Sequence, residues 1–258
     1  MYLSIPPQPD CITTWREAVR SVDASKGHEA HNVLMSVQNP TLGAQLGDPR
    51  VGAVNDFLLS HDKSLQTIAN TIFPTALYRR YGAPEFFDRL HSRVLPTVRR
   101  NDRWSGYYFE RMTDWPDAPS GNPLWDIVTR MRDPSVRARN KFELALFDPA
   151  RDVDRSPYGG QCLSFLSFKL LAGSPETLTL TAFYRNHYYV EKLLGNLIGL
   201  GQLMSFVAEE AGLSLGPLTV LSSHATIDLP KSCVGGSTTR RDFQHLLDSV
   251  DDTEVFEA

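Results

Sequence analysis

The sequence predicts a single α+β domain in which a mixed β-sheet packs on a long buried helix. Residues 162–171 and 177–185 are rich in aromatic and β-branched side chains and flank the turn sequence AGSPE, which predicts a β-hairpin. Residues 189–213 are apolar on nearly every side, as is typical of a helix inside a core. Helical and strand patterns elsewhere occur in separate runs, which favours α+β over a strictly alternating α/β fold.

The other predicted elements follow the spacing of apolar side chains. Helices are expected at residues 13–25, 64–73, 84–95 and 122–133. Strands are expected at residues 31–40, 140–148 and 216–230. The first helix has Thr13 or Thr14 as its N-cap, and turn-forming residues predict loops at 41–52 and 114–123. A single folded domain is therefore expected to span residues 1–230, and residues 231–258 to form a polar, acidic tail.

Composition excludes several classes of function. The chain has 258 residues, and its hydrophobic content of 41% is enough to bury a core. A net charge of −4 gives no basic field, so neither nucleic acid nor an anionic membrane is an expected partner. The longest apolar run, residues 193–208, is too short and too rich in Gly, Asn and Gln to span a bilayer.

The cysteines indicate the compartment. Cys11, Cys162 and Cys233 are odd in number and far apart, which matches neither a disulfide framework nor the paired spacings of a zinc site. No metal site is predicted. The N-terminal sequence has no basic region followed by an apolar segment, so no signal peptide is expected and the protein is assigned to the cytoplasm.

Four polar or reactive residues stand out in the C-terminal half, and each alone has an ordinary structural explanation. Cys162 opens a strand, where a free cysteine usually serves as a small buried hydrophobe. Arg185 could be an exposed residue that caps a strand end. Asn196, in an apolar helix, could bond the backbone through its amide. His224, on the last strand, could be a structural histidine with its hydrogen bonds satisfied. Together they supply a nucleophile, a phosphate clamp, a base-reading amide and a sugar contact, which is the set needed to add a thiolate to a pyrimidine nucleotide.

From Cys162 to residue 228 the chain resembles thymidylate synthases and the related pyrimidine nucleotide hydroxymethylases. The family has a catalytic Cys with Gln at plus five, where this chain has Ser167. Its arginine is followed by Asn at plus eleven, as Arg185 is by Asn196. Its last strand carries a histidine at the place of His224. The resemblance implies that Asn186 and Thr226 also contact the nucleotide.

Upstream, three shorter segments are similar to the family. SGYYFERM carries Tyr108 at the place of a family tyrosine, and RDPSVRAR places Arg137 and Arg139 where the family has an arginine pair that reaches the phosphate of a partner subunit. The helix at 64–73 offers Asn70 where the family has an active-site glutamate. The resemblance therefore implies a homodimer, with Cys162, Asn70 and Tyr108 as catalytic residues.

Three positions differ from the family: Leu163 replaces a histidine, Tyr188 an aspartate that binds the pterin of the folate, and Thr226 a tyrosine at the sugar. The implied activity is methylation or hydroxymethylation at C5 of a pyrimidine nucleoside 5′-monophosphate, with 5,10-methylenetetrahydrofolate as the donor. Two alternatives stay open, namely a non-catalytic nucleotide-binding paralogue and a hydrolase of the glycosidic bond. The hydrolase is the weaker because no clear carboxylate pair is found.

Overall fold

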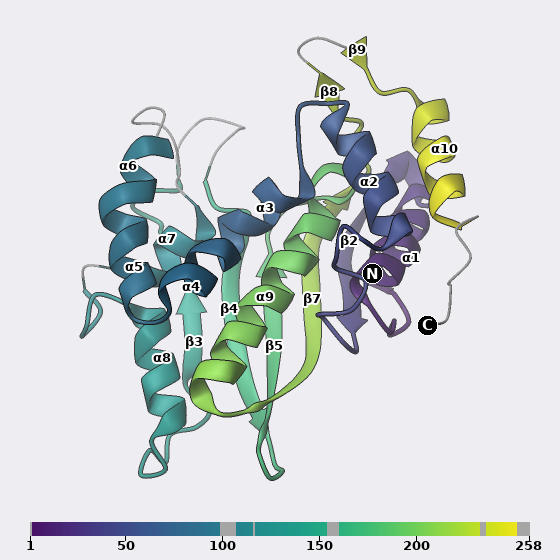
Figure 1. The fold of residues 1–258 in the computed structure, drawn as a ribbon. Helices are drawn as coiled ribbons and strands as arrows, with labels where there is room; N and C mark the ends of the chain where they lie inside the picture. The colour runs from purple at the N-terminus through teal and green to yellow at the C-terminus, as the bar shows by residue number, and fades with distance from the viewer. Residues whose placement is uncertain (1, 99–106, 116, 154–159, 233–235, 252–258) are drawn as a thin grey trace.

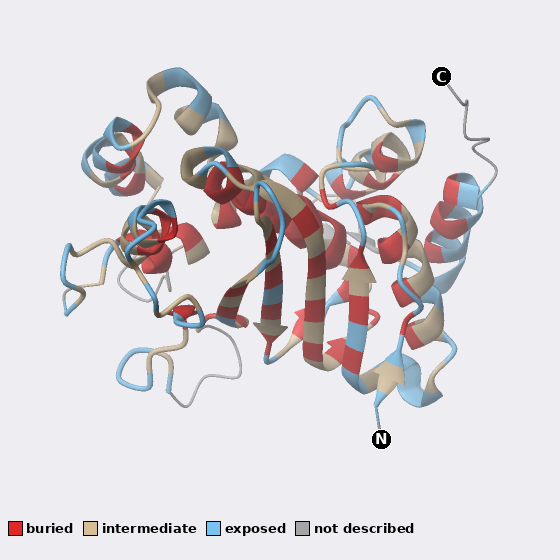
Figure 2. Ribbon diagram, turned by 90° about the horizontal axis from the view of Figure 1, so that it is seen from below, coloured by how far each residue is buried: buried red, intermediate tan, exposed pale blue. Residues whose placement is uncertain are grey.

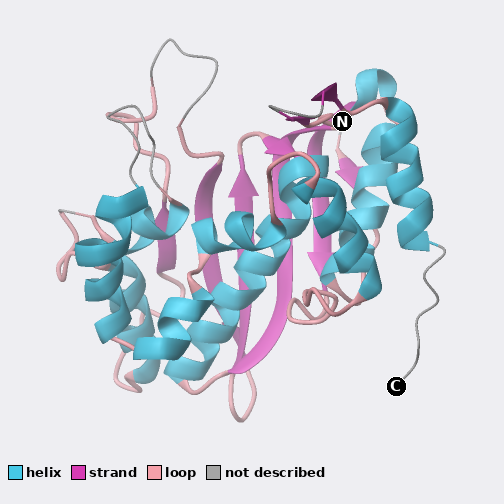
Figure 3. Cartoon of the chain, turned by 45° about the horizontal axis from the view of Figure 1, so that its top comes forward, coloured by secondary structure: helices cyan, strands magenta, loops and turns pink. Residues whose placement is uncertain are grey.

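A seven-stranded mixed β-sheet forms the centre of the protein, and α9 and α3 pass over one of its faces (Figures 1 and 3). The computed structural model describes residues 2–98, 107–115, 117–153, 160–232 and 236–251. The strands are β1 (Leu3–Ser4), β2 (Glu29–Val37), β3 (Phe142–Ala145), β4 (Leu163–Leu171), β5 (Thr177–Tyr184), β6 (His187–Tyr188), β7 (Ser214–Thr226), β8 (Lys231–Ser232) and β9 (Gly236–Ser237).

The α-helices become shorter from α1 to α6, and the longest of them is α9 with 18 residues. The α-helices are α1 (Cys11–Asp23), α2 (Pro49–Leu59), α3 (Leu65–Ile72), α4 (Thr75–Tyr81), α5 (Glu85–Arg89), α6 (Leu95–Val98), α7 (Tyr108–Thr113), α8 (Pro123–Arg132), α9 (Leu194–Ala211) and α10 (Arg240–Asp251). A 3₁₀ turn spans Lys26–His28, and π-helical turns span Leu90–Val94 and Tyr189–Leu193.

The strand order confirms the predicted class. The main sheet runs β1-β2-β7-β5-β4-β3, with β6 paired to the end of β7. β4 and β5 form the predicted antiparallel hairpin, whereas β5 and β7 run parallel because α9 lies between them in the chain. The protein is therefore an α+β domain with a mixed sheet packed on a long buried helix.

Glycines let α9 lie close to its neighbours. A Cβ added to Gly199 would lie 2.8 Å from the carbonyl oxygen of Ala69 in α3, and one at Gly201 would collide with the carbonyl of Pro40. Only glycine fits at these two contacts. Below α9, side chains of β5 alternate between buried positions on one sheet face and more exposed positions on the other (Figure 2). The buried set, Leu178, Leu180, Ala182 and Tyr184, faces α9.

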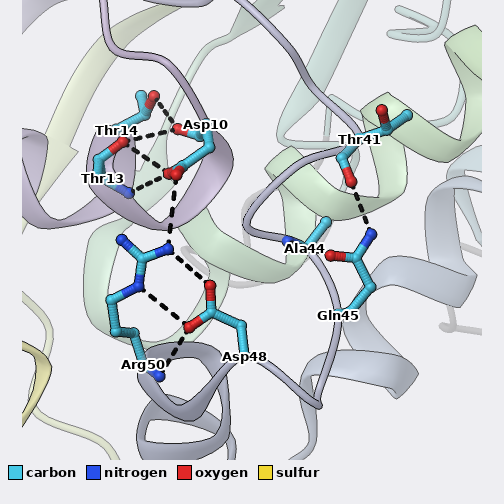
Figure 4. A network of polar contacts seen from close by, with 8 residues as sticks. All are labelled: Asp10, Thr13, Thr14, Thr41, Ala44, Gln45, Asp48 and Arg50. Carbon is cyan, nitrogen blue, oxygen red and sulfur yellow. Dashed lines mark hydrogen bonds and ion pairs between the residues drawn. The ribbon is translucent and has the colours of Figure 1, made fainter. Parts of the chain in front are cut away.

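The segment from 41 to 52 is only in part the predicted loop, because α2 begins at Pro49. Asp48 caps this helix by accepting from the backbone N–H of Arg50 at 2.9 Å. The Arg50 guanidinium also binds the Asp48 carboxylate at 2.6 Å and reaches Asp10, the N-cap of α1, at 3.6 Å (Figure 4). Hydrogen bonds from Arg50 lower the pKa of Asp48, so the carboxylate stays charged and fastens the loop to α1.

The predicted acidic tail contains a packed helix. In α10 the side chains of Phe243, Leu246, Leu247 and Val250 are buried. Ion pairs join Arg240 to Asp23 and Asp251 to Arg20. Cys233, by contrast, lies outside the described residues. Among the helices that the structure describes, none is long and apolar enough to cross a membrane.

Candidate active site

The hairpin places Cys162 beside Arg185. Cys162 directly precedes β4 and Arg185 directly follows β5, so antiparallel pairing brings both to one edge of the sheet. The Arg185 backbone N–H donates to the Cys162 carbonyl at 2.9 Å, and its Nε donates to the Gln161 carbonyl at 3.0 Å. Gly160 has φ of +68°, and a Cβ there would lie 3.4 Å from Arg185 Nη2. The positive φ, more than this contact, explains why a glycine stands two residues before the cysteine.

The charge on the Cys162 thiol depends on two opposing effects. Burial raises the pKa of this thiol above its ordinary value, and the nearby cations Arg185 and Lys192 lower it by less. The thiol is therefore protonated at neutral pH in the free protein, although Arg185 favours the thiolate as the sequence indicates. Loss of its proton is a step that any nucleophilic role must include.

Tyr108 of α7 lies against this thiol. Burial raises the pKa of Tyr108, and the nearby Cys162 sulfur acts in the same direction. The phenol is therefore neutral. Its ring contacts Tyr184 edge-on, with centroids 6.5 Å apart. The structure thus brings together Cys162, Arg185 and Tyr108, and their roles stay predictions.

We expect alkylation of Cys162 by iodoacetamide to report this environment. In a Cys233→Ser background, the alkylation rate should rise with pH. The midpoint of this pH profile should lie above that of a free thiol, since burial is the larger effect on the Cys162 pKa. Arg185→Gln should move the midpoint higher still. Lys169→Gln is the control, because Lys169 binds Glu143 and Ser167 further along β4 and should not move it. A midpoint below that of a free thiol would contradict this environment.

Asn196 belongs to a buried chain of hydrogen bonds. Its Nδ2 lies 2.9 Å from His187 Nε2, and His187 Nδ1 lies 3.0 Å from Ser222 Oγ, which also accepts from the Tyr189 hydroxyl at 3.2 Å. Burial lowers the pKa of His187 to about 3, so its ring is neutral. Because an amide Nδ2 can only donate, the His187 proton sits on Nδ1. Among the described residues nothing donates to Asn196 Oδ1, so this oxygen is free to accept from a ligand.

A second polar group lies at the same edge of the sheet, on β7 and β2. His224 Nδ1 is 2.7 Å from Asn186 Oδ1, and His224 Nε2 is 3.3 Å from Glu29 Oε2. Thr226 lies two residues further along β7 and pairs with both Glu29 and Tyr188. Asn186, His224 and Thr226 are thus neighbours, and their contact with a nucleotide stays a prediction.

Four predicted site residues lie elsewhere. Ser167 bonds Glu143 and Lys169 on the sheet face opposite α9, because a bulge after Leu163 and the two-residue period turn it away. Asn70 accepts from Gln66 in a groove between α3, α4 and α9.

Arg139 pairs with Glu176, before β5, while Arg185 follows it. Glu176 and Arg185 flank the strand at opposite ends, so they are about 30 Å apart at ~3.3 Å per residue. Arg137 lies two residues from Arg139. This pair therefore does not reach Cys162 within one chain.

Three residues of the site are not predicted by the sequence: His187, Tyr184 and Lys192. Tyr184 is fully buried and stacks on His187 with ring centroids 3.9 Å apart. The sequence does hold a signal for two of them. Tyr184 and His187 lie on either side of Arg185 at the end of β5, and alternate residues of this strand face the core.

No family model matches the chain. A protein of Methanopyrus kandleri with the name "Putative thymidylate synthase" is 39% identical to the chain over 87 residues. The match covers 33% of this chain and 40% of the length of that relative. The similarity thus gives weak support to a relationship with thymidylate synthases, over about a third of the chain.

Proposed function

We propose that the protein transfers a one-carbon unit to C5 of a pyrimidine nucleoside 5′-monophosphate, with Cys162 as the nucleophile. The observation that carries the proposal is the pairing of Cys162 with Arg185 at one sheet edge, beside Tyr108 and Lys192. The name of the Methanopyrus kandleri relative supports the same reaction class.

In this proposal Arg185 binds the phosphate and Asn196 binds the base. A guanidinium offers several donors in a fixed plane, which suits a phosphate. Asn196 can accept through Oδ1 and donate through its second Nδ2 hydrogen, which suits the N3 and exocyclic C4 edge of uracil or cytosine. Since His187 fixes the amide orientation, the order of donor and acceptor along this edge is also fixed.

The reaction then starts with loss of the Cys162 proton to solvent, a step that Arg185 and Lys192 favour. The thiolate forms a bond to C6, and the C5–C6 electron pair moves toward the C4 substituent and makes C5 nucleophilic. After C5 forms its new bond, the C5 proton leaves to water, and its electron pair restores the C5–C6 double bond and expels the Cys162 thiolate. Release of tritium from nucleotide labelled at C5 therefore tests the proposal, using UMP, dUMP, CMP and dCMP.

The donor is a separate question. The resemblance implies methylenetetrahydrofolate, but at the position of the pterin-binding aspartate stands Tyr188, which is 38% exposed and offers a phenol instead of a carboxylate. This position does not fit the expected pterin contact, so no step is assigned to the folate here. Tritium release measured with and without methylenetetrahydrofolate decides whether it is the donor.

We also propose a homodimer with shared sites. Arg137 and Arg139 lie far from Cys162 of their own chain, so they can act on a nucleotide only from a partner subunit. The sheet face opposite α9 carries partly exposed apolar side chains suited to such a contact, among them Leu34 and Phe165 at 40% and 38% exposure.

Mixing two inactive variants tests this arrangement. We expect Cys162→Ala chains mixed with Arg137→Ala, Arg139→Ala double-variant chains to regain part of the tritium-release activity, because one hybrid site has both intact halves. Each variant alone, carried through the same denaturation and refolding, is the control. A monomer in sedimentation at micromolar concentration contradicts the dimer.

A further inference from the structure

A cluster of metal-ligating side chains lies on neighbouring strands β2 and β7. Glu29, His31 and His224 each offer one ligand atom, and these atoms lie within 4.8 Å of one another. His31 and His224 are register partners across the antiparallel pair, with ring centroids 5.1 Å apart. Glu29 is two residues from His31 and so projects from the same face of β2.

The hydrogen bond from His224 to Asn186 leaves the other ring nitrogen of His224 available as a metal ligand. Asn186 Oδ1 can only accept, so His224 Nδ1 at 2.7 Å carries a proton and donates it. In the neutral ring, Nε2 then has a free lone pair, and it faces the Glu29 carboxylate at 3.3 Å. Either a proton on Nε2 or a metal ion between the two atoms removes the repulsion of their lone pairs, so the same geometry suits a metal ion. A histidine whose other nitrogen donates to a fixed oxygen is the usual arrangement around protein-bound metals.

We infer that Glu29, His31 and His224 form a binding site for a divalent transition metal, with zinc as the ion that fits best. Two imidazoles and one carboxylate suit zinc, whereas magnesium and calcium prefer oxygen ligands alone. With zinc–ligand bonds of about 2.0–2.1 Å in tetrahedral geometry, ligand atoms lie roughly 3.4 Å apart.

The observed 3.3 Å between His224 Nε2 and Glu29 Oε2 already matches that spacing. The His31 nitrogen must move by at most about 1.4 Å, which a side-chain rotation supplies. Since all three side chains are partly exposed, the fourth position faces solvent and takes water.

The site goes beyond the proposed transferase function, although it shares the sheet edge with it. β7 lies two strands from β4, or roughly 10 Å at ~4.8 Å per strand, and Asn186 lies between the ion and Arg185. Zinc binding is measured on the protein without nucleotide, so its outcome is independent of the tritium-release test.

Zinc titration against a chromophoric chelator tests the inference. We expect one ion per chain, and at least tenfold weaker binding in His31→Asn and in Glu29→Gln. His28→Asn is the matched control: it removes an exposed histidine three residues away, at φ of +57° where asparagine is well tolerated, and should bind as the wild type does. Asn186→Ala should weaken binding about tenfold through loss of the oriented ring.

Cobalt substitution identifies the ligands. We expect visible absorption bands of cobalt with nitrogen and oxygen ligands, which His31→Asn removes. Thiolate charge-transfer bands would place the ion on cysteine and overturn the assignment. Equal losses in His28→Asn and His31→Asn, or no binding to the wild-type chain below about 100 µM zinc, would also overturn it.

Discussion

The variant Cys162→Ala is expected to release no tritium from C5-labelled nucleotide. Without the sulfur no bond to C6 can form, so C5 never becomes nucleophilic. Nucleotide binding should change by no more than about tenfold, or roughly 1.4 kcal/mol, because Arg185 and Asn196 are unchanged. Release of tritium to water measures the first effect, and equilibrium dialysis with the same labelled nucleotide measures the second.

Cys11→Ala is the matched control for this variant. Cys11 is fully buried at the start of α1, where its thiol contacts the Pro40 carbonyl at 3.3 Å, so the substitution should affect stability and leave tritium release intact. Tritium release by Cys162→Ala would exclude this residue as the nucleophile. A wild-type chain that binds the nucleotides but releases no tritium would favour the non-catalytic nucleotide-binding alternative.

The parts of the fold that the sequence predicts are those with a strong local signal. The β4–β5 hairpin has a turn sequence between two β-rich segments, and α9 is apolar all round, so neither depends on distant residues. The sequence predicts a tail at residues 231–258, where α10 lies, because this segment is polar and ends in acidic residues. Its apolar residues at 243, 246, 247 and 250 nevertheless have helical spacing, and their burial against the domain outweighs the polar composition.

The site, too, has contacts that the local sequence predicts and contacts that it does not. The closeness of Cys162 and Arg185 follows from hairpin pairing and is visible in the sequence, whereas a bulge after Leu163 decides which face Ser167 takes. The contact of Glu29 with His224 joins residues 195 positions apart. It depends on the pairing of β2 with β7, which no local pattern specifies.

The variant His187→Phe is expected to lose about 2–4 kcal/mol in the free energy of unfolding. Phenylalanine keeps the ring stacked on Tyr184 but removes both ring nitrogens, so Asn196 Nδ2 and Ser222 Oγ each lose a buried partner. An unsatisfied buried polar group costs about 1–3 kcal/mol. With its amide no longer held, Asn196 can turn and present donor and acceptor in either order. The ratio of kcat/KM for uracil over cytosine nucleotides should therefore move toward one.

Tyr184→Phe is the control within the same aromatic stack, because its expected change in stability has the opposite sign. The Tyr184 hydroxyl is buried, and no partner for it exists in the described part of the chain, so its removal should leave stability unchanged or raise it by up to about 1 kcal/mol. Urea unfolding followed by far-UV circular dichroism measures both variants. If His187→Phe were as stable as the wild type and kept its base preference, His187 would not be the residue that orients Asn196.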